Sequence, residues 1–277
     1  MSHPSYELED LLYLMARLRD PHSGCPWDLK QHWLSIVPHT LEEAYEVVEA
    51  IEAQDWAHVA EELGDLLFQV VYYARFAQEE GRFDFAQILQ GLVEKLLRRH
   101  PHVFPNGQLT DQAEAGGLDE AEVKARWEAI KAQERAQKQA DQSVSVLAGV
   151  PLHLPAMTRA VKLQKRAAQV GFDWDQADQV LDKLEEELGE IREALAQGKQ
   201  QAVAEEVGDL LFACANLARH LKVDPEAAVR QTNRKFERRF HWIEAQCEQQ
   251  NRSMTGPDAP DLATMEAWWQ AAKQQEG

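Results

Sequence analysis

The sequence is poor in cysteine, in basic residues and in long apolar runs, and each shortage excludes a class of protein. Its three cysteines, Cys25, Cys214 and Cys247, form no CxxC motif and no close pair, which is typical of reduced thiols in the cytoplasm. Basic residues number 29 against 47 acidic ones, and the net charge of −18 argues against a surface that binds nucleic acid or anionic lipid. No apolar run approaches the roughly 18 residues of a membrane span, and acidic residues interrupt the N-terminal stretch where a signal peptide would lie. We therefore expect a cytoplasmic protein without nucleic-acid or membrane partners.

Alternating strand patterns are also missing, and apolar residues recur at helical spacing instead. Val207, Leu210, Leu211 and Cys214, for example, follow the i, i+3, i+4, i+7 pattern of an amphipathic helix. The sequence thus predicts an all-α chain, with helices at 5–19, 40–53, 56–79, 84–99, 120–139, 156–169, 176–197, 200–221, 225–250 and 261–275.

Proline and glycine gather in two stretches, 100–119 and 144–156, where helices cannot continue. These breaks predict three parts. An N-terminal helical unit would cover 1–110, a linker with a connecting helix 111–152, and a C-terminal helical unit 153–277.

The two units are related by an internal repeat. The octet EELGDLLF at 61–68 returns as EEVGDLLF at 205–212, and the same offset superposes EEAYE at 42–46 on EELGE at 186–190. A glycine inside a helix costs about 1 kcal/mol relative to alanine, so its presence in both octets needs a reason. We expect these glycines to permit close approach of a backbone or a bound ligand.

Each unit carries two pairs of acidic residues three positions apart on successive helices. Residues at this spacing share a helix face, and antiparallel packing would bring the pairs of one unit together. Neighbouring carboxylates at about 5 Å repel by on the order of 3 kcal/mol, which a divalent cation would relieve. Oxygen ligands favour Mg²⁺ or Mn²⁺ over zinc. One such pair alone is more often a solvated helix face, but the repetition favours metal ligands: Glu43, Glu46, Glu62 and Asp65 in the first unit and Glu187, Glu190, Glu206 and Asp209 in the second.

Basic residues near the second set of acids are candidates for phosphate contacts. Lys235, Arg238 and Arg239 share a helix face in KFERR, where they would bind phosphate oxygens or form surface salt bridges. Lys183 precedes Glu187 by one turn, so it is either a phosphate ligand or the ion-pair partner of that glutamate.

Two further residue types are candidates for contacts with a base or sugar. Asn216 follows Asp209 on the same helix stripe, where its amide would read a base or sugar or serve only as a polar helix residue. Its counterpart in the first unit is Tyr72, so the two units are not expected to bind one ligand equally well. Of Trp268 and Trp269, one ring could stack on a base, although packing of both is the more common outcome.

Together these motifs resemble the MazG family of nucleoside triphosphate pyrophosphohydrolases. The doubled pattern EEAYE with EELGD and EELGE with EEVGD carries the resemblance, with GCPWD, RRHPHVF, VGFDW and KFERRF beside it. The match covers nearly the whole chain. It implies an all-α four-helix unit, repeated in tandem and assembled as a homodimer.

The resemblance also implies an activity, namely hydrolysis of NTPs and dNTPs between the α and β phosphates to a nucleoside monophosphate and pyrophosphate. Mg²⁺ would be held by the four acids of the second unit, and Glu186 or Glu187 would take the proton of the attacking water. Ala202 stands where the family often has a basic residue, with Lys199 the nearest substitute. Catalytic residues would be Glu186, Glu187 and Lys235, and substrate-binding residues Lys183, Asn216, Lys235, Arg238, Arg239 and Trp269.

The second unit is the expected catalytic one because Asn216, KFERR and Trp269 accompany its acids. The first unit would bind metal or nucleotide weakly, or serve regulation and dimerisation. Two alternatives stay open: a nucleotide-binding regulatory or scaffolding helical protein without turnover, and a narrower enzyme for dUTP, a modified base or phosphoribosyl-ATP. Two complete sets of self-repelling acids speak against a scaffold.

Overall fold

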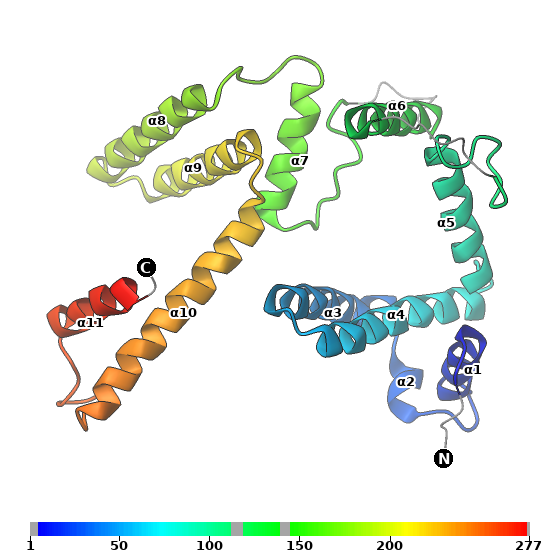
Figure 1. Ribbon diagram of the computed structural model, residues 1–277, viewed down its shortest axis with the longest axis horizontal. Coiled ribbons are helices and arrows are strands. Elements are labelled where there is room, and N and C mark those ends of the chain that lie inside the picture. The colour runs from blue at the N-terminus through cyan, green and yellow to red at the C-terminus, as the bar shows by residue number, and fades with distance from the viewer. Residues whose placement is uncertain (1–4, 112–118, 139–144, 276–277) are drawn as a thin grey trace. The chain divides into compact units, whose positions relative to one another are not determined.

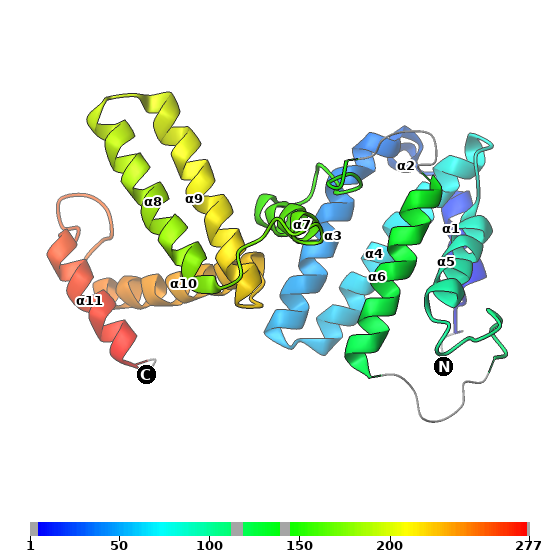
Figure 2. The same ribbon diagram turned by 90° about the horizontal axis from the view of Figure 1, so that it is seen from above.

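The computed structural model describes residues 5–111, 119–138 and 145–275. Every regular element in these ranges is a helix, and the chain divides near residue 140 into two units (Figures 1 and 2). The all-α prediction is therefore confirmed. The helices of the first unit are α1 (Leu8–Leu18), α2 (Pro26–Lys30), α3 (Trp33–Ala53), α4 (Trp56–Glu79), α5 (Phe85–Arg99) and α6 (Glu120–Lys138), and those of the second are α7 (Ala156–Ala168), α8 (Ala177–Ala196), α9 (Gln200–His220), α10 (Pro225–Gln249) and α11 (Leu262–Gln275).

The centre of each unit is an antiparallel helix pair, α3 with α4 and α8 with α9. Short turns join the partners. Gln54 adopts a left-handed conformation at the end of α3, and the Asp55 side chain accepts a hydrogen bond from the His58 amide to begin α4. Gly198, with φ 67°, makes the equivalent turn between α8 and α9. These turns set the two acidic edges of each pair opposite one another.

The first unit has a distinct aromatic core. Tyr72 and Phe76 of α4 pack with Met15 of α1 and Ile36 of α3, all of them buried. The buried apolar residues of the second unit are mostly smaller, and they include Val180 in α8 and alanines in α9. Both helix pairs also leave large apolar side chains exposed along one face.

The start of α3 differs from the sequence prediction, which began this helix at residue 40 because of Pro38. The structure continues the helix through Pro38 from Trp33, and His32 and Ser35 cap its first turn. The proline removes one amide donor, whose acceptor would be the carbonyl of Leu34 in the first turn. Leu34 is exposed, so water can satisfy that carbonyl. The short helix α2 was also missed.

No helix within the described ranges is long and apolar enough to span a membrane.

Candidate functional site

The acidic residues of the α8–α9 pair form a cluster. Glu187 and Glu190 lie one turn apart on α8, and Glu206 reaches them from α9, with one oxygen of each within 4.8 Å of the others. Glu187 is only 4% exposed, and its Oε2 is a buried atom without a hydrogen-bond partner. A buried carboxylate oxygen with no donor is unfavourable unless a cation or donor approaches it. The cluster therefore offers carboxylate oxygens, the ligands that hard cations prefer, and one of these oxygens is buried without a partner.

Two residues at the cluster, Glu190 and Lys183, have raised pKa values, for different reasons. Burial and the neighbouring charge of Glu206 raise the pKa of Glu190 above its usual value. Lys183 places its Nζ 2.7 Å from Glu187 Oε1 and 2.8 Å from Glu186 Oε1, and these two carboxylates raise the pKa of the lysine. Lys183 is thus an ion-pair partner of Glu187 through Oε1, while Oε2 of that glutamate stays without a hydrogen-bond partner.

Asp209 stands outside this group of three. It lies one turn beyond Glu206 on α9, its side chain is exposed, and no oxygen of it belongs to the cluster. An aspartate is one methylene shorter than a glutamate, so its carboxylate stays nearer its own helix. Its role as a fourth ligand stays a prediction.

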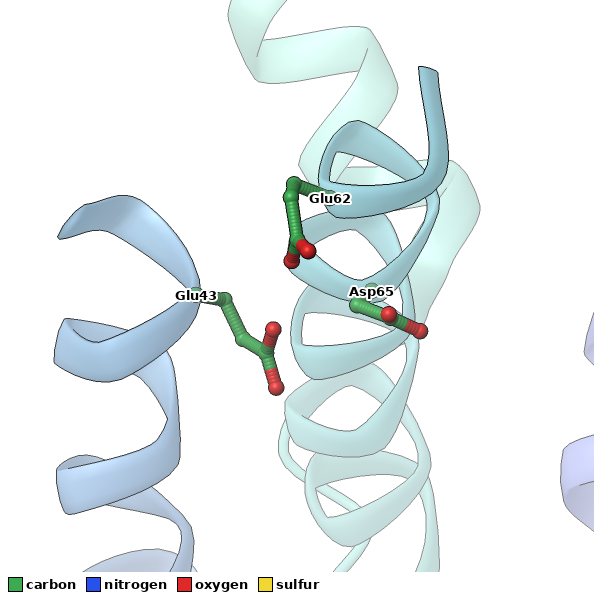
Figure 3. Close-up of side chains that lie close together, drawn as sticks. All are labelled: Glu43, Glu62 and Asp65. Carbon is green, nitrogen blue, oxygen red and sulfur yellow. The ribbon is translucent and has the colours of Figure 1, made fainter. Parts of the chain in front are cut away.

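The first unit repeats the arrangement with different neighbours. Glu43 extends from α3 toward Glu62 and Asp65 on α4 (Figure 3), and one oxygen of each lies within 4.8 Å of the others. Burial and the negative charge of Asp65 raise the pKa of Glu43. His58 contacts Glu62 Oε1 at 2.5 Å, and Gln69 donates to Glu43 Oε1 at 3.3 Å. Protein groups thus already engage two of the three carboxylates.

Glu46 does not join that group, although it lies one turn after Glu43. Burial and the charge of Glu62 raise its pKa. Like Asp209, it stays a predicted ligand.

The glycines of the two octets do not mediate packing within one chain. A Cβ added at Gly64 or Gly208 would meet no atom of the described chain within 4 Å. The expected close backbone approach is therefore wrong for the single chain, because the side of each helix that bears the glycine faces open space.

Asn216 is buried in the C-terminal half of α9, at 3% exposure. Its Oδ1 accepts hydrogen bonds from Arg219 Nε at 3.0 Å and from Arg219 Nη2 at 2.6 Å. Arg219 in turn donates from Nη1 to Asp173 Oδ2 at 2.9 Å. At the corresponding place in the first unit, Tyr72 is buried and donates its hydroxyl to Asp28.

The basic residues of KFERR lie on α10, away from the acidic cluster. Figures 1 and 2 show α10 leaving the α8–α9 pair close to its own first turns. The guanidinium carbon of Arg239 lies 5.4 Å from the ring centroid of Trp269 on α11, and Phe236 packs on that ring at 5.3 Å. The structure thus brings Trp269 to the same helix as Lys235 and Arg238, but it does not bring this group to the acids within one unit.

Sequence reasoning missed the partners of several site residues. Gln164 of α7 is buried beside α9, where its Nε2 donates to the carbonyl of Phe212 at 2.9 Å. Arg219 and His58 were also not predicted. Phe212, the partner of Gln164, and Asp173, one partner of Arg219, lie 48 and 46 residues away in sequence, so local spacing carried no signal for these two contacts. His58, by contrast, precedes Glu62 by four residues, a spacing that could have revealed the pair.

A family model for the MazG nucleotide pyrophosphohydrolase domain matches two segments, residues 31–104 and 176–243. These segments contain both helix pairs and both acidic clusters. The chain belongs to the MazG nucleotide pyrophosphohydrolase family. It is therefore a hydrolase that acts on phosphoric anhydrides, and the two matched domains confirm the tandem repeat.

Members of the MazG family with curated names extend the match along the whole chain. A protein of Escherichia coli (strain K12), named nucleoside triphosphate pyrophosphohydrolase, is 49% identical over 272 residues, which cover 98% of each chain. One of Thermotoga maritima, named nucleoside triphosphate pyrophosphohydrolase/pyrophosphatase MazG, is 39% identical over 265 residues, or 96% of this chain and 95% of the relative. The crystal structure of a mazG-related protein from Thermotoga maritima matches 45% of this chain and 99% of its own, at 28% identity and a TM-score of 0.37.

Proposed function

We propose that the C-terminal unit hydrolyses NTPs and dNTPs between the α and β phosphates, giving a nucleoside monophosphate and pyrophosphate, with Mg²⁺ or Mn²⁺ as cofactor. The observation that carries the proposal is the buried Glu187 carboxylate, whose Oε2 has no partner although Glu190 and Glu206 lie beside it. Relatives that cover nearly the whole chain are named nucleoside triphosphate pyrophosphohydrolases, which supports the substrate class.

The residues present fit a divalent metal ion. Glu187, Glu190 and Glu206 would hold it, with Asp209 as a further ligand one turn along α9. A bound divalent ion would neutralise polyphosphate charge, lower the pKa of the attacking water and stabilise the leaving pyrophosphate. Carboxylate oxygens are the ligands that Mg²⁺ and Mn²⁺ prefer.

The glutamates that contact Lys183 would accept the proton of the attacking water. Glu186 is exposed and lies outside the cluster, so its carboxylate is available to accept the proton of the attacking water. Glu187 is the alternative acceptor. Lys183 holds one oxygen of each and thereby orients both carboxylates. The reaction needs no covalent nucleophile.

Lys235, Arg238, Arg239 and Trp269 would bind the nucleotide, with Lys235 as the catalytic cation nearest the phosphates. Since α10 leaves the α8–α9 pair, we propose that these residues reach the phosphates in the homodimer, where the acids of one copy face α10 of the other. The homodimer would act in the cytoplasm.

Three features of the first unit favour a regulatory or dimerising role for it. Tyr72 fills the place of Asn216, and His58 already contacts Glu62. Arg98 and Arg99, the counterparts of the KFERR arginines, both contact Glu134 of α6. These contacts occupy Glu62, Arg98 and Arg99, whose counterparts in the second unit we propose as ligands of the metal or the substrate.

The test is a product assay with paired variants. The protein is incubated with Mg²⁺ and a panel of NTPs and dNTPs, and we expect nucleoside monophosphate and pyrophosphate. Glu206→Gln should reduce kcat at least 100-fold, whereas the matched change Glu62→Gln should leave it within a few-fold of wild type. Release of orthophosphate and a nucleoside diphosphate would overturn the proposed cleavage, and loss of activity in Glu62→Gln alone would overturn the choice of unit.

The metal requirement needs its own measurement. Chelation should abolish turnover, and calorimetric titration with Mn²⁺ should show binding that Glu206→Gln weakens. Full activity after exhaustive chelation would show that the acids serve another purpose.

A further inference from the structure

The first unit carries a basic cluster at the C-terminal end of α5. Lys95, Arg98 and Arg99 stand at i, i+3 and i+4 in KLLRR, so they share a helix face. They match the three basic positions of KFERR in the second unit. Basic residues in the last turn of a helix also complement its dipole, so the cluster alone indicates no ligand.

An internal carboxylate already occupies this cluster. Glu134 of α6 accepts a hydrogen bond from Arg98 Nε at 2.8 Å on Oε1, and two from Arg99, at 2.6 and 3.1 Å, on Oε2. The side chain of Glu134 is 15% exposed, and the hydrogen bonds from Arg99 and Arg98 lower the pKa of its carboxyl to about 2. Two guanidinium groups thus converge on one anion.

A polyphosphate suits these arginines better than the carboxylate does. Guanidinium groups bind carboxylate and phosphate oxygens with the same fork geometry. Glu134 brings one negative charge to the two arginines, and Lys95 on the same face of α5 adds a third positive charge. Pyrophosphate and the triphosphate of a nucleotide carry more than one negative charge at neutral pH, so they neutralise the cluster more completely.

The helix that supplies Glu134 is shallowly packed. α6 lies against α5 (Figure 2). None of the α6 residues whose burial the structure describes is buried, and Trp127 is 40% exposed. Because few buried apolar contacts hold α6, it belongs to the part of the unit that opens most easily. A competing anion can therefore displace Glu134 without opening the aromatic core.

We propose that Lys95, Arg98 and Arg99 form a second phosphate-binding site, here called the α5 anion site, and that Glu134 blocks it as an internal substitute for the ligand. The ligand is a polyphosphate group, either free pyrophosphate or the triphosphate of a nucleotide. Its binding displaces Glu134 and releases α6 from α5. The inference rests on the proposed function only for the source of the polyphosphate.

Competition with Glu134 sets the affinity of the α5 anion site. While Glu134 holds the arginines, they are closed to other anions, and the apparent dissociation constant rises by the inverse of the fraction of time in which they are open. Glu134→Gln removes the charge of the competitor and keeps the size of its side chain. This variant should therefore bind polyphosphate more tightly than wild type.

Hydrogen exchange of the α6 amides reads this site locally. Inorganic pyrophosphate is the probe, added without divalent cations, and we expect α6 exchange in wild type to rise about threefold or more as Glu134 is displaced. Binding of pyrophosphate at KFERR would not produce this signal in α6. Sodium chloride at the same ionic strength is the control for screening, and an equal rise in both salts would overturn the site.

Variants then assign the contacts by calorimetry with pyrophosphate. Glu134→Gln should tighten binding at one class of site about tenfold, and Glu128→Gln, a change of the same kind within α6, should match wild type. Arg98→Gln combined with Arg99→Gln should remove this class of binding. Arg99→Lys keeps the charge but not the fork, and it should weaken binding about tenfold at unchanged helix content. Equal affinities in wild type and Glu134→Gln would show that Glu134 blocks nothing.

A nucleotide analogue identifies the source of the polyphosphate. α,β-Methylene-ATP is added in parallel with pyrophosphate, and α6 exchange is followed at equal concentrations. A larger rise with pyrophosphate identifies the site as a sensor of product, and a larger rise with the analogue identifies it as a sensor of substrate. Either result supports the α5 anion site, whereas no rise with either compound overturns it.

The outcomes separate this inference from the proposed function. Pyrophosphate release from NTPs, with α6 exchange and pyrophosphate affinity the same in the presence and absence of the Glu134 charge, would overturn the α5 anion site and leave the function intact. Release of α6 by pyrophosphate in a protein that hydrolyses no NTP would support the site and overturn the function.

Discussion

Two glycines sit in the middle of long helices with nothing packed against them. A Cβ at Gly208 of α9 would meet no atom of the described chain within 4 Å, and the same holds for Gly64 of α4. Neither position has a positive φ. Backbone conformation and packing among the described residues therefore do not require glycine there, and no contact among these residues offsets the cost of glycine to the helix.

Replacing Gly208 by alanine should stabilise the second unit by about 0.5–1 kcal/mol, because alanine restricts the unfolded chain and favours the helix. Chemical denaturation measures the change, with Gly64→Ala as the matched control in the first unit. If Gly208→Ala instead raises KM for ATP at unchanged stability, the glycine leaves room for the substrate. A fall in stability that depends on protein concentration would mean that a second copy packs there.

Among the elements, helical periodicity predicted most of the helices, but not the side-chain contacts between them. The stripes in α4 and α9 fixed those helices because their apolar spacing is regular. The first turns of α3 were not predicted because a proline usually ends a helix. Pro38 removes only one amide donor, and the carbonyl that this donor would bond lies in the solvated first turn. Antiparallel packing across a short turn brings three of the four acids of each unit together, whereas Glu46 and Asp209 lie outside the clusters. The hydrogen bond from Gln164 to the carbonyl of Phe212, by contrast, joins two helices, so spacing within one helix could not predict it.

Two arginines of α5 bond to a single acidic residue of α6. Glu134 of α6 accepts hydrogen bonds from Arg99 and Arg98 of α5, and these lower its pKa from 4.5 to about 2. Because the pKa is lower in the folded state, the contact contributes fully above about pH 4.5 and is lost as the pH falls toward 2. The arginines are thereby kept from other anions at neutral pH.

We expect Glu134→Gln to release α6 from α5 at pH 7, and hydrogen exchange of the α6 amides should rise in that variant. The difference between wild type and variant should shrink as the pH falls from 4.5 toward 2, since wild-type Glu134 then also becomes neutral. Glu128→Gln is the control, because the ion pair of Glu128 with Lys131 lies within α6. Equal protection of α6 in wild type and Glu134→Gln at pH 7 would contradict the role given to this residue.

At the scale of the whole molecule, each helix pair leaves an apolar face uncovered. On α8 and α9 these side chains are 40–59% exposed, and on α3 and α4 a similar set is exposed. Exposed apolar faces of this extent favour association, since burial contributes about 25 cal/mol per Å². The MazG-family resemblance of the sequence predicted a homodimer, and pairing of such faces would complete a four-helix unit from two helix pairs. The exposed large apolar side chains of α8 and α9 are Leu181, Leu188, Leu195, Val207, Leu211 and Phe212.

A charge on this face should therefore separate the copies. Leu211 is 52% exposed on α9, and Leu211→Glu would place a carboxylate in the buried centre of the interface, where an unpaired charge is strongly unfavourable. We expect sedimentation to show a dimer for wild type and a smaller species for the variant, and pyrophosphate release to fall with it if α10 of one copy serves the acids of the other. Leu262→Glu, at the exposed first residue of α11, is the control and should stay dimeric. A wild-type monomer with full activity would exclude shared sites, because each chain would then have to bring its own α10 cations to its own acids.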